Sequence, residues 1–528
     1  MRNVLIALVG CVFVFAADGR ADCRTGPPMS VAVREHAIGK DGDFRYVADV
    51  KGGQPPYSYA WTGAVGGAEF KSGERQTPIF LPYLERYAEV TVTDRGGCSA
   101  KAAIGLPPAV AKKMCNTLGY SPVPTPGALQ SAGVEIHFAG GGASWRVALE
   151  NRGLKGVALG LVQLKRPGDT SWNTILKAAG PSEIFVPYHN GTTRLYDMQW
   201  CGASFGNPHP CLRQITPADS SPVTASQITF PGSAYPTVAV ECRDAGVAAL
   251  CKTNAAGEYG MTTRYKEVVF WSVYDTGNYD YIIEYGFRND GAITFRAGAT
   301  GYNNANHVFD PHMHDVVWRV DIDLFGAAGN HVYQLTHSEQ SPNLFAVDSD
   351  TVYPTEGTFN WTAEEFTAML IEGSVTNSFG NEIGYELTPW DRKGTSRHWG
   401  STETFTQKDF WVTANHPGED GTGGTSPNDW GTNGSVQPDA YLMRYVSENA
   451  GLIPFSGPEW IYGPPKTDIV VWYRSAAHHH PHDEDRQASD GPPDMTGLTL
   501  MHWQGFDLLP HDLFDYNPLV PANICYPF

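Results

Sequence analysis

The sequence predicts an all-β protein: an immunoglobulin-like β-sandwich followed by a large antiparallel β-sandwich. Short segments with a two-residue alternation of side chains, such as residues 279–286, are typical of half-buried strands. Few segments show a helical period. Gly and Pro are abundant, with 57 and 38 residues, which fits a chain with many turns.

The overall composition indicates a folded, acidic protein. The chain has 528 residues, enough for two or more domains and a large core. Aromatic residues make up 12% and charged residues only 18%, so most of the chain is expected to fold. The net charge of -19 argues against binding to nucleic acid, which needs a basic surface, and mildly favours the approach of small cations.

Residues 1–21 have the features of an export signal. Arg2 provides a positive start, residues 4–17 are apolar, and small residues up to Ala21 offer a cleavage site. The apolar run is too short to span a membrane. We therefore expect export to the periplasm or the exterior. A lipoprotein signal ending at Cys11 is the alternative, although the apolar run continues past that residue.

The cysteine count fits an oxidising compartment. Eight cysteines remain after the signal, an even number that allows disulfides. We expect Cys23 to pair with Cys98, because they flank the first module, and Cys211 to pair with Cys242 in a local loop. Three pairings stay open for the other four, which are Cys115, Cys201, Cys251 and Cys525.

The first module is expected to span residues 22–106. Its short strands and turn signals resemble a PKD-type immunoglobulin-like domain of secreted bacterial proteins. That resemblance implies contact with a surface or polysaccharide, and a plain spacer is the alternative. Residues 107–129 are proline-rich and are expected to form a linker. Residues 130–528 are predicted to form one long β-rich domain, with a short helix at residues 362–370.

A His-x-His pair is the first candidate metal site. His312 and His314 are two residues apart in a predicted strand, so both side chains point to the same face. Two imidazoles on one rigid strand form half of a metal site. An ordinary pair of core or surface histidines is the alternative.

A second histidine cluster, residues 478–482, follows the apolar strand at residues 468–473. One imidazole from this cluster would complete a three-histidine site with open positions, an arrangement suited to a catalytic transition metal. The alternative is a solvated polar segment that binds metals adventitiously.

The opposite face of the His-x-His strand carries Arg319, Asp321 and Asp323. Two carboxylates two residues apart, together with backbone oxygen atoms, suit a hard cation such as calcium. Solvent-facing carboxylates beside Arg319 are the alternative.

These blocks together resemble the catalytic domain of copper-containing quinoprotein amine oxidases. That family places two copper histidines as His-x-His before an Arg-x-Asp-x-Asp strand, which matches His312 and His314 here. Its third copper histidine is followed at five residues by Glu-Asp, which selects His479. Further matching blocks are residues 409–413, 505–506 and 513–518.

The resemblance implies that Tyr279 is the precursor of the cofactor topaquinone, which copper and oxygen make from the tyrosine ring. Asn278 and Asp280 match the motif around it. The family usually has Thr four residues before this tyrosine, where this chain has Asp275 and then Thr276.

The resemblance also implies a general base. The family has a catalytic Asp after a Val-Pro-Tyr segment, somewhat over eighty residues before the quinone, and Asp197 occupies that position. Tyr188 would hydrogen-bond the quinone oxygen that does not react. Two positions depart from the family: Leu195 replaces the gate tyrosine, and Gln199 replaces a glycine.

A peripheral calcium site is implied as well, and a homodimer is expected because the family is dimeric. The implied calcium ligands are Asp321, Ile322 (carbonyl), Asp323, Asp468 and Ile469 (carbonyl). The implied reaction converts a primary amine, oxygen and water into aldehyde, ammonia and hydrogen peroxide.

Three alternatives to this function stay open. The first is a non-catalytic binding or adhesion protein on a degenerate oxidase scaffold. The second is a copper enzyme without the quinone, and the third is a metal-sequestering protein. Retention of the three histidines and Tyr279 argues against the first.

Overall fold

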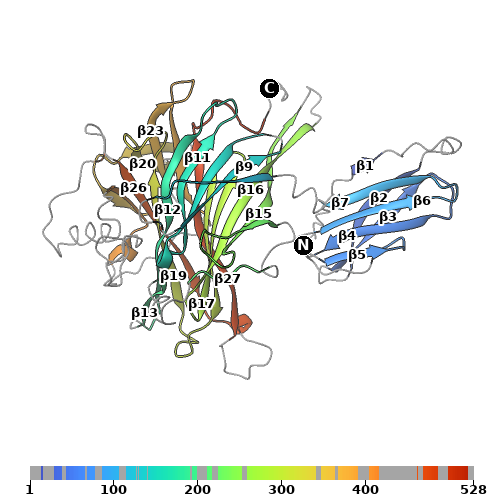
Figure 1. Ribbon diagram of the computed structural model, residues 1–528, viewed down its shortest axis with the longest axis horizontal. Coiled ribbons are helices and arrows are strands. Elements are labelled where there is room, and N and C mark those ends of the chain that lie inside the picture. Colours follow the sequence, from blue (N-terminus) through green and yellow to red (C-terminus); the bar gives the residue numbers. More distant parts are fainter. Residues whose placement is uncertain are drawn as a thin grey trace. The chain divides into compact units, whose positions relative to one another are not determined.

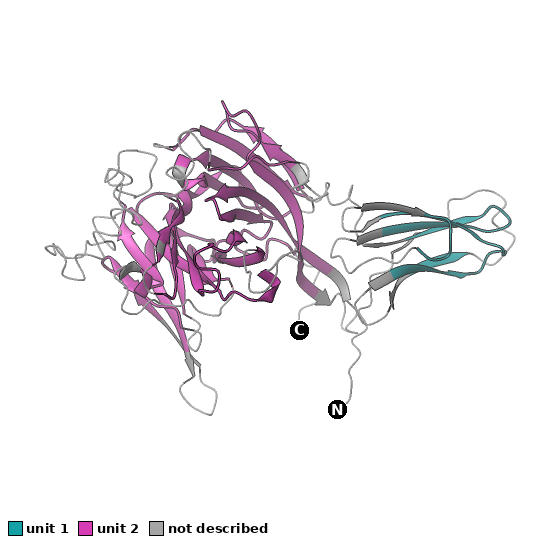
Figure 2. Cartoon of the chain, turned by 90° about the horizontal axis from the view of Figure 1, so that it is seen from below, with its two compact units in different colours: residues 1–114, 221–223 teal, residues 115–220, 224–528 magenta. Residues whose placement is uncertain are grey.

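A computed structural model gives the structure of the protein. The described residues are 13–15, 29–38, 43–65, 68–77, 86–105, 115–125, 128, 130–139, 141–190, 193–198, 211–216, 224–252, 259–339, 346–362, 367–390, 404–415, 461, 468–485 and 497–520. They divide into two compact units, coloured separately in Figure 2. One unit holds residues 1–114 and 221–223, and the other holds the rest of the chain.

The first unit is a small β-sandwich. One sheet pairs β2 (Ser30–Ile38) with β3 (Asp43–Lys51). The other has the order β1-β7-β6-β4-β5. Its strands are β1 (Phe13–Phe15), β4 (Ser58–Val65), β5 (Ala68–Ser72), β6 (Arg86–Thr93) and β7 (Ser99–Gly105). Tyr46, Trp61 and Val90 are buried in its core. The β-rich fold of this module is therefore confirmed, while its PKD type and its role stay predictions.

The second unit contains two ten-stranded sheets, and Figure 1 labels β12, β19 and β26 of one sheet and β16, β17 and β27 of the other. The first sheet has the order β22-β25-β26-β19-β12-β11-β10-β9-β8, and β13 pairs with β12. Its strands are β8 (Cys115–Tyr120), β9 (Gln130–Phe138), β10 (Ser144–Asn151), β11 (Val157–Lys165), β12 (Asn173–Pro187), β13 (Arg194–Tyr196), β19 (His312–Ile322), β22 (Gly357–Phe359), β25 (Phe410–Ala414) and β26 (Ile469–His479).

The second sheet has the order β14-β15-β16-β17-β18-β27-β24-β23-β20-β21. Its strands are β14 (Thr224–Ile228), β15 (Val238–Lys252), β16 (Tyr259–Asp275), β17 (Tyr279–Arg288), β18 (Ile293–Tyr302), β20 (His331–Glu339), β21 (Ala346–Val352), β23 (Ala368–Thr376), β24 (Glu382–Pro389) and β27 (Leu498–His511). Among the described residues, helical structure is limited to Asp197 and Met198 and to three short 3-10 turns, at Gly153–Lys155, Thr404–Gln407 and Asp483–Asp485.

The two large sheets pack face to face and enclose the core. Trp145 of the first sheet donates to the Arg288 carbonyl of the second at 2.9 Å, and Tyr285 donates to the Val157 carbonyl at 2.8 Å. The rings of Phe295 and Trp318 also meet across the interface. All strand pairs in both sheets are antiparallel, so the predicted antiparallel β-sandwich is confirmed.

A disulfide joins the two sheets. Cys115 on β8 bonds Cys242 on β15, at a sequence separation of 127 and a Cα separation of 6.1 Å. The predicted Cys211–Cys242 pair is therefore wrong, because proximity in sequence favoured a local loop over this cross-sheet contact. Cys98 and Cys211 are disulfide-bonded too. Cys23 lies outside the described residues, so its pairing with Cys98 stays a prediction.

Two further expectations need correction. Residues 115–120, expected to belong to the linker, form the edge strand β8, because Cys115 and its neighbours pair with β9. Residues 368–370, expected to be helical, begin strand β23, because their apolar side chains are buried between paired strands.

The predicted signal cleavage site lies outside the described residues. No helix in the described ranges is long and apolar enough to cross a membrane.

Candidate active site

Strand β19 carries the two predicted metal histidines, and the sheet register brings the third one to them. β19 lies between β12 and β26, and all eleven of its residues are buried. In the pairing of β19 with β26, His312 is directly opposite His479. His312, His314 and His479 are fully buried. His312 and His314, predicted from their spacing, and His479, implied by the resemblance, therefore come together, and each offers a nitrogen atom within 4.8 Å of the others.

In each of the three imidazoles, the ring nitrogen that points away from the other two histidines has a polar partner. His312 Nδ1 lies 3.0 Å from the Asp310 carbonyl, and His479 Nε2 lies 2.9 Å from Asp485 Oδ2. His314 Nδ1 lies 2.9 Å from the Tyr281 hydroxyl. Such partners fix the tautomer and ring orientation of metal-binding histidines.

The remaining nitrogens form the metal-binding face. His312 Nε2 and His479 Nδ1 are 3.2 Å apart. His314 Nε2 is buried and has no hydrogen-bond partner among the described residues. A buried polar atom without a partner is costly unless something binds it. The donor set therefore fits a three-histidine copper site.

The electrostatics of the site favour neutral imidazoles. Burial lowers the pKa of His312 to about 4, and nearby His479 and His502 lower it further, while the Asp310 carbonyl opposes them. Burial also lowers the pKa of His314 well below its ordinary value. Because a metal binds the neutral ring, these histidines need not lose a proton near pH 7 to become ligands.

Tyr279 points its hydroxyl at this metal-binding face. Its oxygen lies 3.0 Å from His479 Nδ1 and 3.2 Å from His312 Nε2. It also donates to Asn303 Oδ1 at 3.2 Å. Tyr279 is buried, and burial raises the pKa of its hydroxyl above the ordinary value. The tyrosine predicted to be modified is thus in contact with two of the three candidate copper ligands.

The turn before β17 fixes the backbone of Tyr279. The Thr276 hydroxyl donates to the Tyr279 carbonyl at 2.7 Å, so a threonine is present one residue later than in the family motif. Asn278 donates from its side chain to the Tyr302 carbonyl at 3.1 Å. Asn278 therefore anchors the turn to the end of β18, and the contacts of its side chain lie away from the histidines.

Asp197 is buried beside the tyrosines. The Tyr281 hydroxyl donates to Asp197 Oδ2. Burial raises the pKa of Asp197 to about 7; the Tyr281 hydrogen bond opposes this, and the negative charge of Glu183 adds to it. A carboxylate with such a pKa is suited to act as a general base near neutral pH.

Tyr188 packs against His312, one of the three clustered histidines. Its ring stacks on His312 with centroids 4.4 Å apart, and its hydroxyl has no hydrogen-bond partner among the described residues. Leu195 lies on β13 opposite Val186, where the family has its gate tyrosine. Gln199, the other departure, lies outside the described residues.

The predicted calcium carboxylates also come together. Asp321, Asp323 and Asp468 each offer an oxygen within 4.8 Å of the others. Burial, and then the charges of the other two, raise the pKa of Asp323 to about 7. The Ile322 carbonyl accepts a hydrogen bond from Asn330 at 3.1 Å. The cluster therefore concentrates negative charge, which a hard cation would neutralise.

Three residues of the site were not predicted in these roles. Tyr281 links Asp197 to His314, Asn303 accepts from Tyr279, and Asp485 orients His479. The two-residue period of β17 placed Tyr281 on the same face as Tyr279, so that signal was available. Asn303 follows β18 in the chain, and nothing in the sequence around it indicates a contact with Tyr279.

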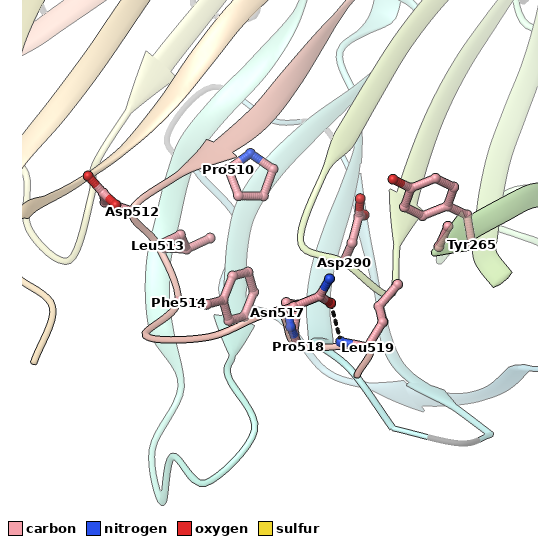
Figure 3. A pocket seen from close by; sticks show the side chains of 10 residues that line it. Tyr265, Asp290, Pro510, Asp512, Leu513, Phe514, Asn517, Pro518 and Leu519 are labelled. Atoms are coloured by element: carbon pink, nitrogen blue, oxygen red, sulfur yellow. Dashed lines mark hydrogen bonds between the residues drawn. The ribbon is translucent and has the colours of Figure 1, made fainter. Parts of the chain in front are cut away.

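A pocket elsewhere in the second unit contains none of these residues. Its volume is about 310 Å³, and the segment after β27 forms much of its wall, as Figure 3 shows. In that segment the Leu519 amide donates to Asn517 Oδ1 at 2.9 Å. The residues at the wall include Pro510, Phe514 and Tyr265. The pocket is therefore separate from the histidine site.

Comparisons with known proteins place this site in a family. The sequence profile described as "Copper amine oxidase, enzyme domain" matches residues 143–523. "Amine oxidase [copper-containing] alpha 3, peroxisomal" of Arabidopsis thaliana is 22% identical over 429 residues, covering 72% of this chain and 59% of that protein. "Primary amine oxidase" of Klebsiella aerogenes is 24% identical over 328 residues, covering 54% and 40%. The chain thus spans less than two thirds of the length of these relatives.

Solved structures show the same fold. A copper-containing benzylamine oxidase from Hansenula polymorpha has a TM-score of 0.51 and 15% identity, covering 93% of this chain and 89% of that one. An Aspergillus nidulans amine oxidase also has a TM-score of 0.51, with 14% identity, covering 96% of this chain and 69% of that one.

Proposed function

Because the chain belongs to the copper amine oxidase family, we propose that it is an exported, copper- and topaquinone-dependent primary amine oxidase. The observation that carries this proposal is the position of the Tyr279 hydroxyl, 3.0 Å from His479 Nδ1 and 3.2 Å from His312 Nε2. A tyrosine that is to be oxidised at a copper centre must lie within reach of the metal.

His312, His314 and His479 would hold copper through their three inward-facing nitrogens. Bound copper would supply the redox chemistry needed to oxidise Tyr279 to topaquinone. Asp310, Tyr281 and Asp485 keep the imidazoles in the tautomers that copper binding requires.

Asp197 would act as the general base that removes a proton from the α-carbon of the bound amine. Its pKa of about 7 leaves a large fraction deprotonated at neutral pH while keeping it basic enough to take the proton. The Tyr281 hydroxyl holds one carboxylate oxygen in place, which leaves the other for the substrate.

Tyr188 would orient the quinone. Its ring is held against His312, and its buried hydroxyl is available to donate a hydrogen bond to an oxygen of the cofactor. Leu195 replaces the family's gate tyrosine, so we expect a wider and less polar amine channel than in the family.

We further propose a peripheral calcium ion bound by Asp321, Asp323 and Asp468, with the Ile322 and Ile469 carbonyls as backbone ligands. The closeness of the three carboxylates supports this site. A homodimer and export are proposed from the family and from the signal-like residues 1–21.

A non-catalytic metal-binding or adhesion protein on a degenerate oxidase scaffold is the alternative. The departures at Asp275, Leu195 and Gln199 favour it. The buried contact between Tyr279 and the histidines favours the oxidase, because a surface-binding role would not require it.

An amine oxidation assay tests the proposed function. The protein is purified without copper, reconstituted with Cu(II) in air, and supplied with a panel of primary amines while hydrogen peroxide is measured. Copper-dependent peroxide formation is expected. Its absence from protein that holds one copper per chain but carries no quinone would favour the scaffold alternative.

A further inference from the structure

A second mixed cluster of imidazole and carboxylate groups lies in the second sheet. His331 is on β20, Glu372 on β23 and Glu382 on β24, three adjacent strands. Figure 1 labels β20 and β23 next to each other. The register places His331 opposite Glu372, and Glu372 opposite Gly384, which is two residues after Glu382. All three side chains therefore share one face of the sheet.

That face is turned away from the core. The residues next to the cluster in each strand, Val332, Ile371 and Ile383, are fully buried on the other face. The cluster is thus distinct from the copper-site histidines, which are on the other sheet of the sandwich.

The distances in the cluster are compatible with a shared metal. His331 Nε2 lies 3.1 Å from Glu382 Oε2 and 3.6 Å from Glu372 Oε2. Charge-assisted hydrogen bonds are about 2.7–2.9 Å long. Two ligand atoms bound tetrahedrally at about 2.0 Å from zinc are about 3.3 Å apart. The observed separations lie on either side of that value.

Neighbouring groups orient the imidazole and leave room for the carboxylates. His331 Nδ1 lies 3.4 Å from the Gly329 carbonyl, which turns Nε2 toward Glu372 and Glu382. A Cβ atom at position 384 would lie 3.1 Å from the Glu372 Cγ atom and 2.7 Å from the Ile371 carbonyl oxygen. Glycine at position 384 therefore gives Glu372 the space to reach His331.

The cluster brings two carboxylates to one imidazole. Among the described residues, Glu372 and Glu382 form ion pairs with His331 and with no other group. Two carboxylate ligands would offset the charge of a divalent cation.

A cavity beside the cluster gives access to it. Its volume is about 590 Å³, and Glu372 forms part of its wall together with Glu386, His337 and His511. An ion bound by three protein ligands could therefore complete its coordination with water from this side.

We propose that His331, Glu372 and Glu382 bind a divalent transition cation of the zinc class, separate from the copper of the active site. One imidazole nitrogen and two carboxylate oxygens suit zinc, whereas calcium takes oxygen ligands alone. Because its ligands come from β20, β23 and β24, the ion would cross-link three strands of the sheet.

The test uses the copper-loaded, quinone-containing protein after loosely bound ions have been removed with a chelator. Cobalt(II) is the probe, because tetrahedral cobalt gives a strong visible spectrum. We expect one cobalt per chain in addition to copper, displaced by zinc. His331→Gln and Glu372→Gln should each weaken cobalt binding by about 100-fold. Glu386→Gln, at the wall of the same cavity, is the matched control and should bind normally.

Unchanged copper content in both ligand variants would show that they fold. No cobalt beyond the copper site would overturn the proposal. Equal cobalt binding in the parent and in both ligand variants would overturn it too, because the ion would then be bound elsewhere, for instance by the exposed histidines His478, His480 and His482.

Discussion

The hydroxyl of Tyr281 donates a hydrogen bond to the carboxylate of Asp197. The same hydroxyl lies 2.9 Å from His314 Nδ1, so one tyrosine connects the candidate base to a candidate copper ligand. Removing this contact should change the pKa of Asp197, because burial raises that pKa and the hydrogen bond lowers it.

We predict that Tyr281→Phe shifts the acid limb of the pH profile of kcat/KM to higher pH. Without the hydrogen bond the pKa of Asp197 rises, so at a given pH a smaller fraction is deprotonated and active. A hydrogen bond to a charged group corresponds to a shift of about one pH unit. Quinone content, measured with a carbonyl reagent, is the control. An unshifted profile would mean that Tyr281 does not tune the base.

We predict that Asp197→Asn still forms the quinone but oxidises amines about 10²–10⁴-fold more slowly, the usual contribution of a general base. The amide keeps the size of the carboxylate but cannot take the proton. Single-turnover reduction of the quinone under anaerobic conditions measures this step alone. Near-normal rates would remove Asp197 from the mechanism.

We predict that Asp485→Asn weakens copper binding by about 10–100-fold, because Asp485 orients His479 through a 2.9 Å contact to Nε2. Competition with a copper chelator measures the affinity. Asp483→Asn is the matched control, because Asp483 is exposed in the same short turn. Equal losses in the two variants would point to a general effect of acidic charge.

We predict that the double variant Cys115→Ser, Cys242→Ser loses about 2–4 kcal/mol of unfolding free energy. The disulfide spans 127 residues and joins the two sheets, so it restricts the unfolded chain. Urea unfolding of the copper-free protein measures the difference. An unchanged free energy of unfolding would show that packing between the sheets does not need the covalent link.

Residue spacing was sufficient for much of the site and the fold. The i, i+2 rule put His312 and His314 on one face, and the alternation in residues 279–286 predicted β17. These are local signals, because the strand period places side chains without knowledge of the partner strand.

The rest depended on contacts between distant segments. Cys115 pairs with Cys242 only because β8, the edge strand of one sheet, comes close to β15 of the other, which no spacing in the sequence predicts. Asn303 and Asp485 act through single hydrogen bonds from loops and turns. At residues 368–370, where a helix was expected, burial between neighbouring strands outweighed a weak helical signal.

The most direct test of the account is titration of the copper-reconstituted protein with phenylhydrazine, followed by peptide mass analysis. We predict a coloured adduct at one per chain, located on the peptide that contains Tyr279, and no adduct in Tyr279→Phe. A protein that binds one copper tightly at its histidines yet forms no adduct would contradict the account, because Tyr279 would then lie at the metal without becoming the cofactor.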